Sequence, residues 1–192
     1  MKEILFFTHN RNKVIEVKQI LKTNKINLQK LDNFSDVVEP KETGNTFSEN
    51  AKIKSRYGQK ISNIPCFADD SGFCVEALND GPGIRSKRFL EKFSSNIQAF
   101  EHIIRKATKE NNYRAYFVTA ICLTLKKNHH INFIGKIKGR ISLKPKGNNG
   151  FGYDPIFIPR NYKKTFAEMN TKEKSEISHR KIALTKLKSF LF

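Results

Sequence analysis

The sequence is poor in cysteine, with only three in 192 residues. No two of them, Cys66, Cys74 and Cys122, stand in a Cys-X-X-Cys pair, so neither a disulfide framework nor a thiolate zinc site is predicted. Disulfides form and persist in oxidising compartments. The cysteine content therefore fits a reducing, cytoplasmic setting.

Long apolar runs are also absent. No stretch approaches the roughly 20 apolar residues that a membrane-spanning helix needs. The apolar run within residues 1–7 is too short for a signal peptide, and no small-residue cleavage site accompanies it. No internal repeat, proline-rich linker or low-complexity block divides the chain. We therefore expect a single domain over residues 1–192, with no membrane partner.

Acidic residues are scarce: 18 Asp and Glu stand against 36 Lys and Arg, which gives a formal net charge of +18. Such a charge is typical of nucleic-acid-binding proteins. However, 27 of the basic residues are Lys and only 9 are Arg, beside 18 Asn, as a low-GC genome would produce. Bidentate phosphate recognition favours Arg instead. We interpret the lysines as a solvated surface that attracts small polyphosphates; a basic nucleic-acid-binding protein without nucleotide turnover is the alternative.

Apolar patterning predicts strands and helices that alternate at first and are then interrupted by a hairpin. The expected strands are 4–8, 64–68, 113–125 and 131–137, and the expected helices begin near residues 11, 46, 95 and 178. Capping boxes at Thr46–Glu49 and Thr165–Glu168 each indicate the N-terminus of a helix. Together these elements predict an α/β fold, a mixed sheet with helices on both faces.

Helical periodicity also predicts which residues share one face of a helix. Asn50 and Lys54 should share one face of the second helix, one turn apart. The inward residues expected in the other helices are Val14, Val17 and Leu21, then Ile97, Phe100, Ile104 and Ala107, and finally Ala183, Leu184, Leu187 and Leu191.

The pair Asp69-Asp70 stands where the second strand is expected to end. Adjacent residues of a strand point to opposite sides, so one carboxylate is expected to be structural while the other faces a ligand. A turn that caps a helix is the alternative. With Asp70, Glu42 could supply oxygen ligands to Mg²⁺, which takes only one or two protein carboxylates. A solvated loop position is the alternative for Glu42.

Several cations and one aromatic side chain lie near these carboxylates or in glycine-rich sequence. Lys13, Lys54, Lys174 and Arg180 lie on or beside helices near the loops, where they suit a metal-bound polyphosphate or are ordinary surface residues. His179 stands with Arg180 at a helix N-terminus, where the dipole disfavours cations unless an anionic or carbonyl group binds. Phe151, between Gly150 and Gly152, either fills a core gap or stacks on a planar base.

Six segments of the chain resemble motifs of the non-standard purine nucleoside triphosphate pyrophosphatases, the inosine/xanthosine triphosphatase (Ham1-like) family, and they stand in the same order as in that family. The segments are Thr8–Lys13, Glu42–Lys54, Phe67–Gly72, Gly81–Arg88, Gly150–Pro155 and Glu173–Arg180. Each is weak alone, and the six in order cover the chain from about Ile4 to its C-terminus.

The resemblance implies a long mixed twisted sheet flanked by helices, two lobes with the active-site cleft between them, and a homodimer. It also implies Mg²⁺-dependent hydrolysis of ITP, XTP and dITP to the monophosphate and pyrophosphate. Asp70 would be the proton acceptor and, with Glu42, a Mg²⁺ ligand. The substrate-binding residues carried over are Thr8, His9, Asn10, Arg11, Asn12, Lys13, Lys54, Ser71, Phe151, Gly152, Tyr153, Asp154, Lys174, His179 and Arg180.

Two positions depart from the family's pattern. His9 stands where the phosphate loop usually has a small residue, and we expect its side chain to point outward. The Lys-rich stretch from Lys126 to Lys146 matches no family motif, so we expect it to be surface that catalysis does not need. An intermediate alternative keeps the fold but has broader triphosphate or dinucleotide specificity. GTP also carries the 6-keto group that His179 and Arg180 would recognise, so these two residues do not account for its rejection.

Overall fold

The computed structural model describes residues 2–21, 26–33, 37–127 and 129–192. These residues form a mixed α/β fold in which one seven-stranded sheet is flanked by helices, as predicted. The strands are β1 Lys2–Phe6, β2 Ile26–Lys30, β3 Cys66–Val75, β4 Gly81–Pro82, β5 Arg114–Lys126, β6 His129–Ile141 and β7 Phe157–Pro159. The helices are α1 Arg11–Ile20, α2 Phe47–Ser62, α3 Ser86–Leu90, α4 Asn96–Lys109, α5 Thr171–Ile177 and α6 His179–Leu191.

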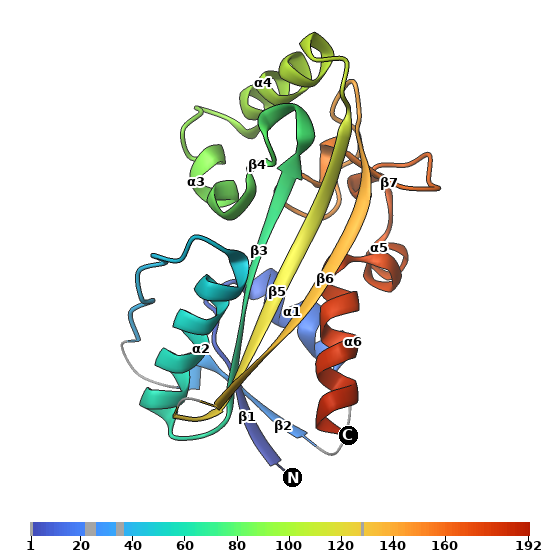
Figure 1. The fold of residues 1–192 in the computed structure, drawn as a ribbon. Coiled ribbons are helices and arrows are strands. Elements are labelled where there is room, and N and C mark those ends of the chain that lie inside the picture. The colour runs from blue at the N-terminus through green and yellow to red at the C-terminus, as the bar shows by residue number, and fades with distance from the viewer. Residues whose placement is uncertain (1, 22–25, 34–36, 128) are drawn as a thin grey trace. The chain divides into compact units, whose positions relative to one another are not determined.

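The sheet has the order β2-β1-β3-β5-β6-β7, with β4 paired to β3 outside this path (Figure 1). Strand β1 pairs with β2 and β3 in parallel, whereas β4 and β7 pair in antiparallel fashion with β3 and β6. The predicted pair of consecutive strands is present as β5 and β6. Strand β5 has the expected length and is shifted by one residue, whereas β6 is longer than expected; residue 128 of their connection lies outside the described residues.

The chain forms two compact units. The first consists of Met1–Asp70, Thr119–Gly135 and Lys181–Phe192, and the second of Ser71–Val118 and Lys136–Arg180. Strands β3, β5 and β6 contribute residues to both, so each unit contains several separate segments of the chain.

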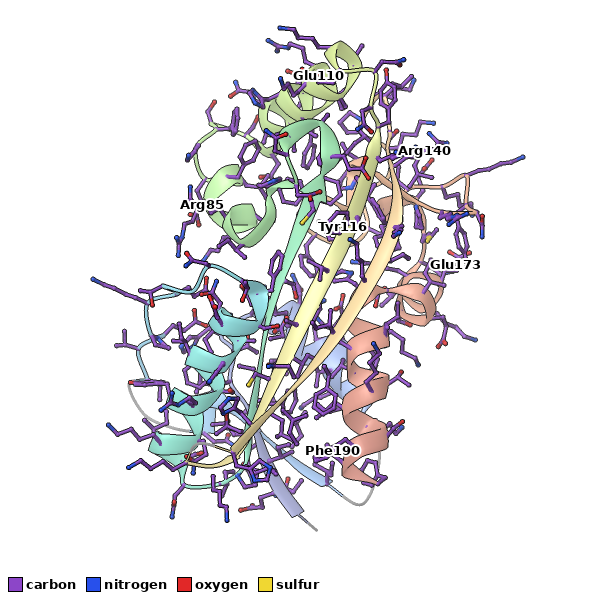
Figure 2. The ribbon with its side chains drawn as sticks, in the orientation of Figure 1. Arg85, Glu110, Tyr116, Arg140, Glu173 and Phe190 are labelled. Atoms are coloured by element: carbon purple, nitrogen blue, oxygen red, sulfur yellow. The ribbon has the colours of Figure 1, made fainter. Side chains whose placement is uncertain are left out.

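In the first unit both faces of the sheet are covered. Ile4 and Phe6 of β1 pack with α1 and α6, while Leu5 and the following Phe7 pack on the other face with Tyr57 of α2. Figure 1 accordingly shows α2 on one side of the strands and α6 on the other, with Phe190 near the end of α6 in Figure 2. Burial on both faces explains why residues 4–7, which form the last part of β1 and the position after it, are all apolar, whereas Lys2 and Glu3 at its start are charged.

The second unit has a core of aromatic side chains beneath α4. Phe73, Phe117 and Phe157 contact one another there, and Phe100 of α4 packs against the same cluster. Tyr116, labelled in Figure 2, precedes Phe117 in β5 and is half-buried. The ammonium nitrogen of Lys136 lies 3.3 Å from its ring centroid.

Two expectations about these elements were wrong. The strand expected at 64–68 does not end at Asp69: β3 continues to Val75, because the adjacent carboxylates find buried cationic and amide partners. In α4, which Ser95 caps as predicted, Ile97 is 59% exposed and not inward. Ala99 and Ile103 take the buried positions beside Phe100 and Ala107, because the four lie three or four residues apart or adjacent on one face of the helix.

The other helix predictions agree with the structure. The capping box at Thr46 is formed with Glu49, and Asn50 and Lys54 are both buried on α2. The second box, at Thr165, is also formed, but it begins a 3₁₀ helix, Phe166–Glu168. Val17, Leu21, Ala183, Leu184 and Leu187 are buried as expected.

The three cysteines are free and buried. Burial raises the pKa of the Cys74 thiol to about 11, and it raises the pKa values of Cys66 and Cys122 as well. A thiol with a raised pKa is a poor nucleophile and metal ligand at neutral pH. The cysteines therefore contribute packing, and the chemistry of the chain lies elsewhere.

Gly58 determines how closely α2 approaches the sheet. A Cβ added there would lie 2.5 Å from Cys66 Sγ and 2.8 Å from Phe7 Cδ2. We expect Gly58→Ala to lower the free energy of unfolding by about 1–3 kcal/mol through overpacking, although Ala is the better helix former. Urea denaturation measures this, with exposed Lys60→Ala in the same helix as the control. An unchanged or increased stability of Gly58→Ala would contradict the tight packing.

Candidate functional site

Polar side chains of the first unit gather around the end of its part of β3. Asp69 and Asp70 are 2% and 6% exposed, and their partners differ as strand alternation predicts. Lys13 of α1 forms an ion pair with Asp69, 3.0 Å from Nζ to Oδ2. Asn50 of α2 donates through Nδ2 to Asp70 Oδ2 at 3.1 Å. A turn that caps a helix is therefore excluded for this pair.

The ammonium group of Lys54 forms ion pairs with both Glu42 and Asp70. Its ammonium nitrogen lies 2.7 Å from Glu42 Oε1 and 3.8 Å from Asp70 Oδ1. Burial disfavours the charge of Lys54, but Asp70, Asp69 and Glu42 together outweigh burial and raise its pKa. Glu42 is thus a half-buried ion-pair partner, and not a solvated loop residue.

The carboxylate of Asp70 is held in an environment that favours its neutral form. Burial raises its pKa, and the nearby charge of Glu42 acts in the same direction, while Lys54, Asn50 and Lys13 oppose them. A carboxylate whose pKa is raised is a stronger proton acceptor than one in water. Asp70 is therefore the residue of this group best suited to general-base chemistry.

The segment before α1 presents polar groups beside β1. Asn10 caps the helix: its side chain accepts hydrogen bonds from the backbone N–H groups of Asn12 and Lys13. Thr8 is buried, and its hydroxyl accepts from Asn10 N. The side chains of Arg11 and Asn12 are exposed. Lys13 thus has its backbone held by the cap and its ammonium group by Asp69.

His9 is exposed, in accordance with the outward orientation expected from sequence. Its Nε2 is 3.0 Å from the carbonyl oxygen of Val37, and its backbone N–H donates to Glu39 Oε1. His9 therefore connects the loop before α1 to the segment that leads to Glu42.

The second unit contains a separate group of buried charged side chains. Lys174 of α5 and Asp154 form an ion pair with 2.6 Å between Nζ and Oδ2, and both are nearly inaccessible to solvent. The same Oδ2 accepts from the backbone N–H of Phe151 at 2.8 Å. Gly150 has φ +78° and leaves no space for a Cβ next to Asp154. Asp154 therefore fixes both the glycine-rich loop and Lys174.

The ring of Phe151 is half-buried and lies near two cations. Lys174 Nζ is 4.7 Å from its centroid and the guanidinium carbon of Arg180 is 5.9 Å away. Arg180 also donates to the hydroxyl of Ser71 at 3.3 Å. The two cations lie near a ring that the sequence left as either a core filler or a stacking surface.

His179 and Tyr153 are more deeply packed than the other predicted site residues. The His179 ring stacks on Phe117, with centroids 4.8 Å apart and an interplanar angle of 11°. Tyr153 stacks on Phe73, and its hydroxyl donates to the carbonyl oxygen of Ser86. Gly152, with φ +61°, has open space where a Cβ would lie. Tyr153 thus anchors this loop in the aromatic core.

The predicted site residues therefore belong to two groups. Those of the first unit are Thr8, His9, Asn10, Arg11, Asn12, Lys13, Glu42, Lys54 and Asp70, and those of the second are Ser71, Phe151, Gly152, Tyr153, Asp154, Lys174, His179 and Arg180. Asp70 and Ser71 are consecutive in β3, so a single peptide bond joins the two groups.

The sequence did not indicate Asn50 as a site residue, and it left the role of Asp69 open. Both are buried polar residues with a charged partner in the site. The available signal for Asn50 was its place one turn before Lys54 on the same helix face. An amide that the helix turns inward needs a polar partner, which here is Asp70.

Among the described residues, no group of three or more His, Cys, Asp or Glu side chains is arranged to hold a metal ion. Mg²⁺ does not require one, because it is usually held by one or two carboxylates together with water and phosphate oxygens. Glu42 and Asp70, which converge on one ammonium group, provide that number and kind of donor.

Comparison with known proteins shows that nearly the whole chain matches one protein family. The model of the Ham1 family matches residues 4–190. A dITP/XTP pyrophosphatase of Borrelia duttonii is 45% identical over 100% of this chain and 98% of its own length. That of Christiangramia forsetii is 38% identical over 98% of both. The structure of a HAM1 protein from Coxiella burnetii superposes with a TM-score of 0.91 at 35% identity, covering 100% of this chain and 98% of that one.

Proposed function

Because the chain belongs to the Ham1 family, we propose that it hydrolyses non-standard purine nucleoside triphosphates, namely dITP, XTP and ITP, to the monophosphate and pyrophosphate. Such an enzyme removes deaminated purines from the nucleotide pool before they are incorporated into nucleic acid. The observation that carries the proposal is Asp70, a buried carboxylate with a raised pKa beside a second carboxylate and two lysines.

We assign Glu42 and Asp70 as the ligands of a divalent cation, Mg²⁺. Their oxygens have the chemistry that this cation prefers, and both already lie next to one positive charge. When bound, the cation would offset charge on the triphosphate and on the leaving pyrophosphate. Lys54 would supply further positive charge at the same place.

Asp70 acts as the proton acceptor for the attacking water. Water is a weak nucleophile until a positioned base removes its proton, and a base with a raised pKa does so more readily near neutral pH. Asn50 holds one oxygen of Asp70, which limits rotation of the carboxylate. Lys13, held by Asp69, and the segment from Thr8 to Asn12 bind the phosphates.

The residues of the second unit bind the nucleoside. Phe151 offers a ring for stacking on the base, and Gly152 leaves open space beside it. Ser71, Lys174, His179 and Arg180 provide donors, of which His179 and Arg180 suit the 6-keto oxygen of deaminated purines. Tyr153 and Asp154 hold the loop in place. The amino group of adenine would leave donor facing donor, at a cost of roughly 1–3 kcal/mol.

We further propose that residues 1–192 work as one catalytic domain, in a cytoplasmic homodimer. Three buried free cysteines suit a reducing compartment. No helix in the part of the chain that the structure describes is both long and apolar enough to cross a membrane. Nucleic-acid binding is not needed to account for the charge, since the substrates are polyanions that a basic surface attracts.

The proposed reaction is tested by the products formed from XTP. With Mg²⁺ we expect XMP and pyrophosphate in equal amounts, and removal of the metal with EDTA should abolish turnover. Chromatographic separation of the nucleotides, with a pyrophosphate assay, measures both. Formation of XDP and orthophosphate, or undiminished turnover in EDTA, would contradict the proposal.

A further inference from the structure

Asn50 forms two buried hydrogen bonds that link the two carboxylates assigned to the metal. It is 2% exposed and lies in the first turns of α2. Its Oδ1 accepts from the backbone N–H of Gly44 at 2.9 Å, two residues after Glu42. Its Nδ2 donates to Asp70 Oδ2 at 3.1 Å. One amide thus contacts both the loop that carries Glu42 and the carboxylate of Asp70.

The two bonds determine which way the amide of Asn50 points. The Gly44 N–H can only donate and an ionised Asp70 can only accept, so Oδ1 must face Gly44 and Nδ2 must face Asp70. A flipped amide would place donor against donor and acceptor against acceptor. Neither Leu, which has no polar atoms, nor Asp, which has no donor when ionised, can make both bonds.

The bond to Asn50 also distinguishes the two oxygens of Asp70. Asn50 engages Oδ2, whereas Oδ1 lies 3.8 Å from Lys54 Nζ, beyond hydrogen-bonding distance. The same ammonium group is bonded to Glu42 at 2.7 Å. With Oδ2 engaged by Asn50, Oδ1 is thus the oxygen of Asp70 recorded near the ammonium group that Glu42 binds.

The loop that carries Glu42 cannot move away from Asn50 without losing close packing. A Cβ on Gly44 would lie 2.6 Å from Glu49 Cβ and 2.8 Å from Asn50 Oδ1. The capping box strengthens this contact, because Glu49 accepts from the backbone N–H groups of Asn45 and Thr46. Loop 42–46 is thus closely attached to the start of α2.

We propose that Asn50 is a positioning residue that sets the relative placement of Asp70 and the Glu42 loop, and thereby determines the affinity for the divalent cation. Residues that hydrogen-bond to metal ligands orient them, and their loss typically lowers metal affinity about 10–100-fold. The inference rests on the proposed function only in taking Glu42 and Asp70 as metal ligands.

Direct Mn²⁺ binding, followed by electron paramagnetic resonance without nucleotide, tests this role, since Mn²⁺ accepts the same oxygen ligands as Mg²⁺. We expect Asn50→Leu to weaken the Mn²⁺ affinity about 10–100-fold. Gly44→Ala should also weaken the Mn²⁺ affinity. The added Cβ displaces Asn50 Oδ1, although the backbone N–H of residue 44 and the side-chain amide of Asn50 are both still present. The Mn²⁺ binding that the wild type shows and Asp70→Asn lacks is the binding at this site.

Ser55→Ala is the matched control. It removes a buried hydrogen bond from the same helix, between Ser55 and Thr124, without touching either carboxylate. Its Mn²⁺ affinity should equal that of the wild type. Wild-type affinity in folded Asn50→Leu and Gly44→Ala, or an equal loss in Ser55→Ala, would overturn the role of Asn50. If Mn²⁺ binds as described but XTP is not hydrolysed, the proposed function fails while this inference stands.

Discussion

Asp70→Asn is expected to lower kcat for XTP by about 10²–10⁴-fold, the usual contribution of a general base. Asparagine keeps the size of the side chain but cannot accept the proton of the attacking water. The fold should be retained, because burial already favours the neutral form of Asp70, as its raised pKa indicates. Steady-state pyrophosphate release measures kcat, and a thermal melt checks the fold.

Glu110→Gln is the control for this substitution, since it makes the same chemical change at an exposed carboxylate, that of the C-cap residue of α4 (Figure 2). Its kcat should equal that of the wild type. Turnover by Asp70→Asn within a few-fold of wild type would remove Asp70 from the role of proton acceptor, and Glu42 would become the carboxylate to test.

Lys174→Met is expected to have the largest effect on stability, lowering the free energy of unfolding by about 3–5 kcal/mol. The side chains of Lys174 and Asp154 are only 9% and 3% exposed, so the substitution removes one charge of a buried ion pair. The hydrogen bond from the backbone of Phe151 remains but does not neutralise the charge. Chemical denaturation at pH 7 measures the loss.

Two further variants show whether the loss comes from the buried charge. Adding Asp154→Asn to Lys174→Met removes the uncompensated carboxylate and should restore a large part of the stability. Lys106→Met breaks the exposed ion pair with Glu110, also at close range, and should cost no more than about 1 kcal/mol. Equal effects of Lys174→Met and Lys106→Met would show that burial does not strengthen the pair.

Local signals allowed much of the fold to be predicted from the sequence. The capping box at Thr46 depends on residues three positions apart, and the inward face of α6 follows from helical periodicity. The prediction that Asp69 and Asp70 point apart needed only the two-residue repeat of a strand. These features are determined within a few residues, and they were confirmed.

Predictions failed where distant residues determine the structure. The sequence around Asp69-Asp70 favours a turn, yet β3 continues through it because Lys13 and Asn50 supply partners from two helices. The burial of Ala99 in place of Ile97 depends on which face of α4 meets the sheet. Periodicity gives the spacing of a buried face, but packing decides where that face begins.

The candidate site shows the same division. Motifs gave the residue types, but not their pairing: nothing in the sequence indicates that Asp154 belongs with Lys174, or that Phe117 supports His179. Asn50 was predicted to share a helix face with Lys54, but its partner Asp70 lies 20 residues away in the sequence. The active-site cleft between two lobes and the homodimer, which the resemblance implies, stay predictions.

The most direct test of the proposed function is the ratio of kcat/KM for dITP to that for dATP, measured as pyrophosphate release with Mg²⁺. The two substrates differ at the 6-position, where donors are expected to meet the keto oxygen. An unpaired donor costs roughly 1–3 kcal/mol, which predicts a ratio of about 5–150 in favour of dITP. Equal values for the two substrates would contradict a role in removing deaminated purines, and no pyrophosphate from either would contradict the reaction itself.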